Sequence, residues 1–131
     1  MWNRIKPTYG SQIRVNRGLY YHHGIYESDD VVYHFASTIG ELDPETAEVC
    51  ITTLDNFLKG GILEVREYTQ EEKEKLRSPD EIIKYAKDHL GEKGYDIVSN
   101  NCEHFSNRCA FGVSSSSQVD DFMNVLRGLF K

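Results

Sequence analysis

Hydrophobic and polar residues alternate in several short runs in the first half of the chain. The alternation covers residues 11–17, 19–26 and 31–36, and a further run of this kind occupies 62–68. A period of two residues predicts β-strands with one buried face. Turn residues at 28–30 separate the second run from the third, so we expect these two strands to form a hairpin.

The second half of the chain has helical spacing instead. Ser78 is followed by a proline and, three positions after the serine, by a glutamate, which is the pattern of a capping box. The elements expected after the first three strands are a helical turn over residues 53–58, a helix over 78–90, a strand over 95–99, a helix from 102 to 111 and a helix from 118 onward. The last helix carries an apolar stripe that we expect to pack on the core, formed by Val119, Phe122, Met123 and Leu126. Strands first and helices after them indicate an α+β fold, with an antiparallel β-sheet packed against helices that are segregated to one side.

The composition is that of one globular domain. The 131 residues are 39% hydrophobic, which suffices for a single core, so we assign residues 1–131 to one domain. The formal net charge of -6 disfavours binding to nucleic acid and leaves at most peripheral contact with a membrane. No apolar run approaches the ~18 residues of a spanning helix, and the N-terminus lacks a signal-peptide core. We therefore expect a soluble, cytoplasmic protein.

Three cysteines are present, and Cys102 is distinguished by its position. An odd number of cysteines in a chain without a secretion signal argues against a disulfide framework. Cys102 lies in the first turn of an expected helix, where free N–H groups and the helix dipole favour a thiolate. We therefore interpret Cys102 as a nucleophile. The alternative is a small buried hydrophobic residue, and we prefer that role for Cys50 and Cys109.

Two neighbouring strands carry the histidines that could activate this thiol. Alternation puts His22 and His23 on opposite faces of one strand, and the hairpin brings one of them close to His34. The register decides which pair meets, because a slip of one residue exchanges the two faces. One histidine of the pair would act as the base, and the other would orient it. The backbone N–H of Cys102 and the hydroxyl of Tyr20, on the face of His22, could stabilise an oxyanion.

A metal site is the alternative use of these residues. Four side chains could supply ligands, namely Cys102, His104, His22 and His34. The Cys-x-His pair, however, lacks a second pair at zinc-finger spacing. We therefore expect neither a metal nor a cofactor.

Three segments together resemble one known family. Residues 101–105, with the sequence Asn-Cys-Glu-His-Phe, resemble the cysteine motif of the lecithin:retinol acyltransferase-like proteins, which include the H-Ras-like suppressor phospholipases and acyltransferases. Residues 20–26 and 31–35 resemble the two histidine motifs of that family, in the same order along the chain. The resemblance implies a circularly permuted relative of the papain-like and NlpC-type thiol hydrolases, in which the histidines precede the cysteine.

Position by position, the resemblance implies a Cys-His-His triad. Cys102 corresponds to the nucleophile, His22 to the base, and His34 to the polar member that orients the base. The implied activity is that of a thiol-dependent, phospholipase A-like acyl hydrolase or acyltransferase, which acts on phospholipid or other acyl esters through an acyl-cysteine intermediate. A cysteine peptidase or amidase on the same triad, or a non-catalytic regulatory binding module, is the alternative. The resemblance is to a compact member, without the hydrophobic C-terminal anchor that mammalian members often carry.

Overall fold

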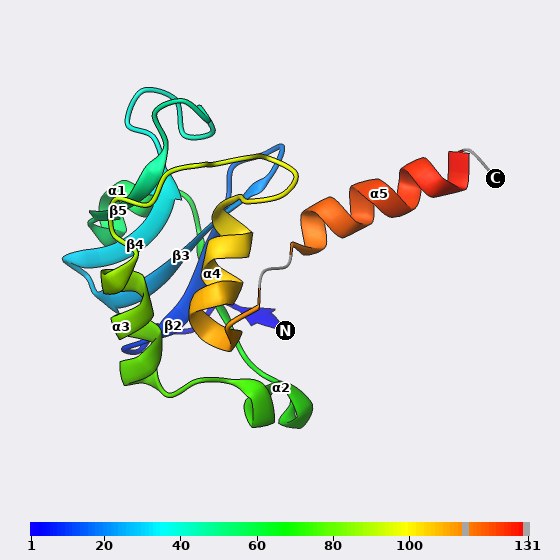
Figure 1. The fold of residues 1–131 in the computed structure, drawn as a ribbon. Helices are drawn as coiled ribbons and strands as arrows, with labels where there is room; N and C mark the ends of the chain where they lie inside the picture. The colour runs from blue at the N-terminus through cyan, green and yellow to red at the C-terminus, as the bar shows by residue number, and fades with distance from the viewer. Residues whose placement is uncertain (114–115, 130–131) are drawn as a thin grey trace.

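Within residues 1–113 and 116–129, which the computed structural model describes, a six-stranded antiparallel β-sheet forms the centre of the molecule (Figure 1). In spatial order the strands run β1-β6-β2-β3-β4-β5, so that β2, β3 and β4 lie in the middle. The strands are β1 (Trp2–Asn3), β2 (Ser11–Asn16), β3 (Tyr21–Ser28), β4 (Val31–Ala36), β5 (Glu48–Thr52) and β6 (Leu63–Arg66).

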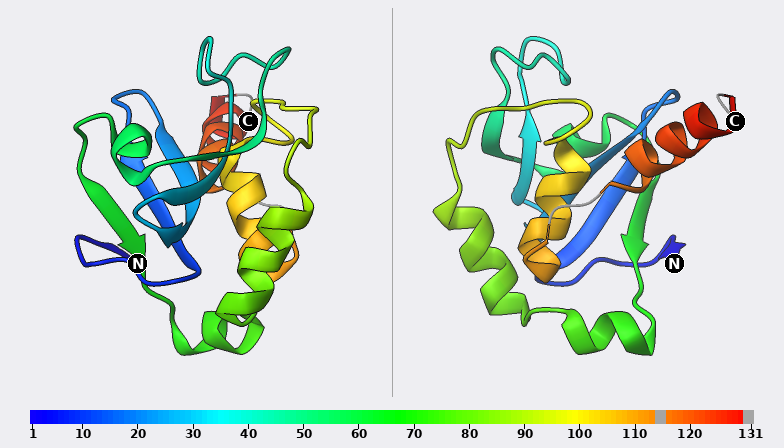
Figure 2. Two further views of the ribbon diagram at one scale, coloured as in Figure 1. Left: turned by 90° about the vertical axis from the view of Figure 1, so that its left-hand side faces the viewer. Right: turned by 45° about the vertical axis from the view of Figure 1, so that its right-hand side comes forward.

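Helices pack on both faces of this sheet, so the expectation that they lie on one side is wrong (Figures 1 and 2). The helices are α1 (Leu54–Leu58), α2 (Gln70–Lys75), α3 (Pro79–Asp88), α4 (Cys102–Phe111) and α5 (Ser117–Leu129). α3 and α4 lie side by side on one face, and α1 lies on the other (Figure 2). In the part of the chain that the structure describes, no helix is both long and apolar enough to cross a membrane.

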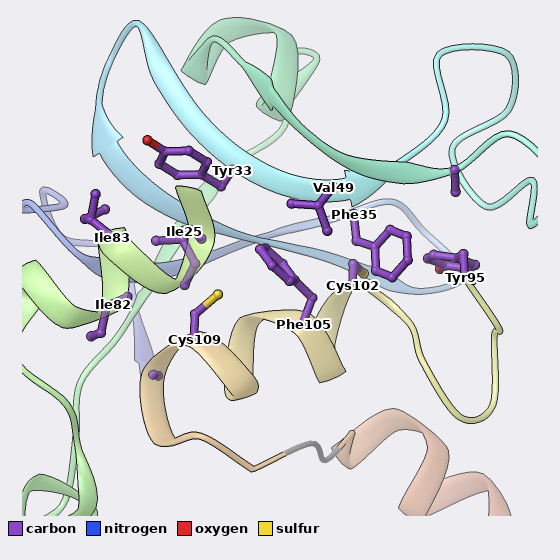
Figure 3. Close-up of a cluster of buried hydrophobic side chains, with 13 residues drawn as sticks. Ile25, Tyr33, Phe35, Val49, Ile82, Ile83, Tyr95, Cys102, Phe105 and Cys109 are labelled. Atoms are coloured by element: carbon purple, nitrogen blue, oxygen red, sulfur yellow. The ribbon is translucent and has the colours of Figure 1, made fainter. Parts of the chain in front are cut away.

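The core has two parts, one on each face of the sheet. The larger part lies between the sheet and helices α3 and α4, and it includes Phe35, Cys102 and Phe105 (Figure 3). The smaller part lies under α1, where Phe57 packs with Val32. Each large apolar side chain that is removed from water contributes roughly 2–3 kcal/mol to folding. The same burial fixes α4, and with it Cys102, against the middle of the sheet.

β3 and β4 form the expected hairpin, and its register decides which histidine meets His34. Tyr26 pairs with Val32, and a register irregularity follows near the turn. In this register His22 lies beside His34, whereas His23 faces α4. The pairing that the alternation left open is therefore resolved in favour of His22.

Gly24 allows α1 to lie unusually close to β3. A Cβ atom at this position would lie 2.8 Å from Cε2 of Phe57 and 3.0 Å from the carbonyl oxygen of Tyr33. Only glycine leaves this space free. As a result the ring of Phe57 packs on both His22 and His34, with centroid distances of 5.1 and 6.1 Å.

Residues 95–99 do not form the expected strand. An isolated bridge joins Asp96 to Asn100, and the Asp96 carboxylate accepts the N–H of Val98. Ile97 and Val98 are both exposed. This apolar run therefore belongs to a loop, and sheet packing does not account for its apolar side chains.

Two strands form where the alternation predicts none. β1 pairs with β6, and β5 pairs with β4, so both lie at the edges of the sheet. Edge strands bury less of each side chain, and exposed residues such as Ile51 interrupt the pattern in β5. Composition alone therefore gives little signal for them.

α5 differs from the expected core helix. It begins at Ser117, one residue earlier than expected, and the Ser116 hydroxyl accepts the N–H of Val119. Met123 is exposed, and α5 extends away from the sheet in Figures 1 and 2. The expected packing of Met123 on the core is therefore wrong. The side chains of Phe122 and Leu126 lie outside the described residues.

Candidate active site

The motif at residues 101–105 begins α4 with a capping box. The Asn101 side chain accepts the N–H groups of Glu103 and His104. In return, Nδ1 of His104 accepts the N–H of Asn101 at 3.0 Å. These bonds satisfy donors that the first turn of a helix leaves without partners. Asn101 and His104 thus fix the helix start, and Cys102 becomes the first helical residue.

Cys102 is buried at this helix start against β3. The residue is 2% exposed, and its thiol lies 3.9 Å from the carbonyl oxygen of Tyr21. The sulfur also accepts the backbone N–H of His23. Sγ therefore contacts the strand backbone on both sides of His22.

Burial controls the ionisation of Cys102. Removal from water raises the pKa of this thiol to about 12, and the backbone N–H donors do not offset the effect. Burial thus opposes the thiolate that the helix start favours. At pH 7 the thiol is neutral, so nucleophilic attack needs a base that takes its proton.

His22 and His34 form a direct hydrogen bond across the hairpin. Nε2 of His22 lies 2.8 Å from Nδ1 of His34. Burial, followed by the charge of His34, lowers the pKa of His22 well below 6.5, and burial lowers the pKa of His34 to about 4. Both imidazoles are therefore neutral at pH 7 and able to accept a proton.

The other ring nitrogen of His22 lies near the Glu41 carboxylate. Among the described residues, Nδ1 of His22 has no hydrogen-bond partner, although it is buried. Oε1 of Glu41 lies 3.7 Å from it. The ring of His22 packs on Phe57, whereas Cys102 packs in the cluster on the α4 side. The imidazole and the thiol thus flank the first residues of β3.

Glu41 is a residue of this site that the sequence analysis did not find. It lies in the loop between β4 and β5, where its carboxylate accepts Nε and Nη2 of Arg17, both at 2.9 Å, and the hydroxyl of Tyr20. Burial alone would raise the pKa of Glu41, but these donors and His22 lower it to about 2. A single glutamate in a polar loop gives no signal, because its partners lie 21 and 24 residues away in the sequence.

The Tyr20 hydroxyl is bound to Glu41 in this arrangement. Burial and the Glu41 carboxylate raise the pKa of Tyr20, so it remains a hydrogen-bond donor. Tyr20 also lines the same cleft as Cys102. The roles of the Tyr20 hydroxyl and the Cys102 N–H as oxyanion donors stay predictions.

His23 faces the opposite side of β3. Its Nε2 lies 3.8 Å from a carboxylate oxygen of Glu103, and its ring meets that of Trp2 edge-on at 5.4 Å between centroids. The Ser116 hydroxyl donates to Glu103 at 2.6 Å. His23 therefore belongs to a buried polar cluster beside α4, apart from the paired histidines.

An apolar cleft of about 390 Å³ opens beside Cys102. The lining comes mainly from Leu19, Tyr21, Leu42, Tyr95, Ile97, Val98 and Val119. Leu19, Ile97 and Val98 are also exposed to solvent, so they form the rim of the cleft. A concave apolar surface with few polar groups is typical of a site for an acyl chain. The cleft explains why the apolar run near Ile97 lies outside the core.

The metal-ligand set that the sequence allowed is not assembled. His104 is bonded within the cap of α4. Among residues 1–113 and 116–129, no group of three or more His, Cys, Asp or Glu side chains could hold a metal ion.

The fold and the chain order together define a class of protein. An antiparallel sheet with histidines on its central hairpin, followed in the chain by a helix that begins with a cysteine, is the permuted form of the papain-like and NlpC-type fold. The model of the family described as Lecithin retinol acyltransferase matches residues 5–115. The chain therefore belongs to this family.

The chain is similar both to proteins named Phospholipase A and acyltransferase and to proteins named Lecithin retinol acyltransferase. It is 32% identical to Phospholipase A and acyltransferase 2 of Homo sapiens over 127 residues, which cover 88% of this chain and 78% of that protein. It is 31% identical to Phospholipase A and acyltransferase 4 of Homo sapiens over 126 residues, or 88% and 76% of the two chains. It is 26% identical to Lecithin retinol acyltransferase of Rattus norvegicus over 143 residues, with 93% of this chain but only 62% of the rat protein covered.

Proposed function

We propose that this protein is a thiol-dependent acyl hydrolase or acyltransferase in which Cys102 attacks an acyl ester. The observation that carries the proposal is the 2.8 Å hydrogen bond between His22 on β3 and His34 on β4. The first residues of β3 also contact Sγ of Cys102. The relatives are named as phospholipases A and acyltransferases, which supports chemistry of this kind.

The proposed reaction starts from a neutral thiol and a neutral imidazole. Nδ1 of His22 accepts the proton of Cys102 while Sγ attacks the carbonyl carbon of the ester. His34 holds the imidazole through its other nitrogen, and the backbone N–H of Cys102 donates to the oxyanion.

Collapse of the tetrahedral intermediate breaks the bond between the carbonyl carbon and the leaving oxygen. His22 returns its proton to that oxygen, which leaves as an alcohol, and a thioester remains on Cys102. Water, or an alcohol or amine acceptor, then attacks the thioester and gives a proton to His22. This proton passes to Sγ, so the neutral thiol is restored and the acyl group leaves as an acid, ester or amide.

The substrate that we propose is a phospholipid or another long-chain acyl ester. The apolar cleft beside Cys102 supports an acyl chain rather than a polar peptide as the bound group. The net charge of -6 favours a neutral or zwitterionic substrate over a polyanion.

Intact-mass spectrometry after incubation with zwitterionic phospholipid or with a soluble acyl ester tests the proposal. We expect one added acyl group, on Cys102, in the native chain and in Cys109→Ala, and none in Cys102→Ala. Cys109 is the matched control because it is a buried cysteine on the same helix. Ester turnover that persists at the native rate in Cys102→Ala would overturn the mechanism.

The same experiment distinguishes the alternative functions. Peptide amides cleaved faster than every ester would replace the proposal with a peptidase or amidase that uses the same residues. Binding of phospholipid without turnover or adduct, by the native chain, would replace it with a non-catalytic binding module.

A further inference from the structure

We propose that Glu41 is a positioning residue of this site, which stabilises the protonated form of His22 during acyl transfer and holds the loop that forms one wall of the acyl cleft. The inference rests on the proposed function, because it assigns a role in that reaction. It concerns a residue outside the motifs that carry the family resemblance.

The Glu41 carboxylate is held in a fixed position by Arg17. Two parallel hydrogen bonds of 2.9 Å join the guanidinium to the two carboxylate oxygens, and the carboxylate side chain is only 11% exposed. Such a bidentate pair is stronger and better oriented than a single contact. Arg17 also donates to the carbonyl oxygens of Phe57 at 2.6 Å and Leu58 at 3.2 Å.

Arg17 therefore ties the Glu41 loop to the end of α1. This is the helix whose Phe57 packs on both imidazoles. One guanidinium group thus contacts both the loop and the helix that border the paired histidines. Movement of the Glu41 loop would move the charge that lies nearest to the free nitrogen of His22.

The charge of Glu41 acts directly on that nitrogen. Oε1 lies 3.7 Å from Nδ1 of His22, which is too long for a hydrogen bond but close for a charge in a buried site. When Nδ1 takes the proton of Cys102, the imidazolium gains this attraction, which the neutral ring lacks. The carboxylate therefore favours the transition state over the resting state.

Other charges around His22 act in both directions. Arg17, His34 and His23 each disfavour a proton on the ring, whereas Glu41 favours one. Lys59, with Nζ 3.6 Å from the Glu41 carboxylate, is exposed and partly offsets its charge. Glu41 is thus a negative charge beside His22 that opposes the positive charge of Arg17.

The next residue along the chain connects this network to the cleft. Leu42 lines the apolar cleft beside Cys102, while the neighbouring Glu41 side chain is bound to Arg17. Fixing one residue of the loop therefore fixes the other. The ion pair sets both the charge at the base and one wall of the acyl site.

The pH dependence of kcat for ester turnover tests this role with two substitutions of opposite charge effect. We expect Glu41→Gln to lower kcat about tenfold and to move the acid limb of the profile to lower pH by ~1 unit, because His22 then holds a proton less tightly. We expect Arg17→Gln to move the acid limb in the opposite direction, because the positive charge of Arg17, which disfavours a proton on His22, is then removed. Glu41→Asp, which keeps the charge, restores part of the loss.

A matched control is available at the other end of the sheet. Glu72 also pairs with an arginine, Arg66. The backbone N–H of Thr69 and the Arg66 guanidinium lower the pKa of Glu72 to about 2, against the opposing effect of burial. Glu72→Gln keeps a side chain that can complete the α2 capping box, and we expect it to leave the kcat profile unchanged. Thermal unfolding of every variant checks that the fold is retained.

Distinct outcomes separate a failure of this inference from a failure of the proposed function. Acid limbs that stay in place, or that move in the same direction in Glu41→Gln and Arg17→Gln, overturn the role of Glu41 and indicate a purely structural ion pair. The native chain would still form its acyl adduct on Cys102 in that case. If Glu41→Gln does not fold, the direction of the shift in Arg17→Gln decides the question.

Discussion

Nε2 of His22 lies 2.8 Å from Nδ1 of His34, so that one hydrogen bond links the two buried imidazoles. One of these nitrogens must donate and the other must accept. If His22 donates from Nε2, its Nδ1 carries a lone pair and is the basic nitrogen. By accepting the Nε2 proton, His34 would then stabilise the tautomer of His22 in which Nδ1 is unprotonated, as a carboxylate or amide does in other nucleophilic triads.

Substitution of His34 tests this orienting role. We expect kcat for ester turnover to fall ~100-fold in His34→Leu, which has no acceptor for the Nε2 proton of His22. The loss should be smaller in His34→Gln, whose amide oxygen can accept that proton. Steady-state kinetics and the rate of acyl-adduct formation measure both variants. Equal losses in Leu and Gln variants would contradict an orienting hydrogen bond.

The histidine hairpin could be predicted from the sequence because its signals are local. Period-two alternation gave residues 31–36 the same bounds as β4, and the capping box at Ser78 gave the start of α3. The register could not be predicted, since it depends on packing between His22 on β3 and Phe57 on α1, which are distant in the sequence. The resemblance to a family favours His22 over His23, and in the structure His22 is hydrogen-bonded to His34.

The features that the sequence missed depend on distant contacts. Glu41 belongs to the site only through Arg17 and Tyr20, which lie on other elements. The ionisation of Cys102 was expected from the helix start, a local feature, but burial by the rest of the fold outweighs it. The apolar residues near Ile97 line the rim of the cleft and not the sheet. In the sequence, however, such a short apolar run has the pattern of a strand.

The cap of α4 should matter for both stability and activity. Asn101→Ala removes the acceptor of two backbone N–H groups, so we expect the free energy of unfolding to fall by ~1–2 kcal/mol. Ser78→Ala, at the start of α3, is the matched control with a similar expected loss. Urea unfolding measures both. Only Asn101→Ala should also lower kcat, because it precedes Cys102, and equal activity of the two variants would argue against this.

Acid should destabilise the fold from near neutral pH. Burial lowers the pKa of His34 from 6.5 to about 4, so the unfolded chain binds more protons in this range and stability falls as the pH drops from about 6.5 to 4. The pKa values of His22 and His23 are also lowered by burial and act in the same direction. Each such histidine costs up to ~1.4 kcal/mol per pH unit within its window.

Below this range Glu41 continues the loss. Its pKa is lowered from 4.5 to about 2, so the stability that its carboxylate provides is lost as the pH falls through that interval. Urea midpoints measured between pH 7 and pH 3 test both effects. We expect a steady fall that is shallower between pH 6.5 and 4 in His34→Gln. A midpoint that is constant from pH 7 to pH 5 would contradict the neutral, buried state of the histidines.

The rim of the cleft should determine how the enzyme responds to acyl-chain length. Val98→Ser and Leu19→Ser remove apolar contact from the mouth of the cleft beside Cys102. We expect each to lower kcat/KM about fivefold for long-chain esters and to leave acetyl esters unchanged, since each lost methylene contact is worth up to ~0.8 kcal/mol. Val125→Ser, an exposed valine on α5, is the matched control and should have no effect. A series of esters with increasing chain length gives the measurement. A loss of equal size for acetyl and long-chain esters would mean that these side chains shape the catalytic centre and do not bind the acyl chain.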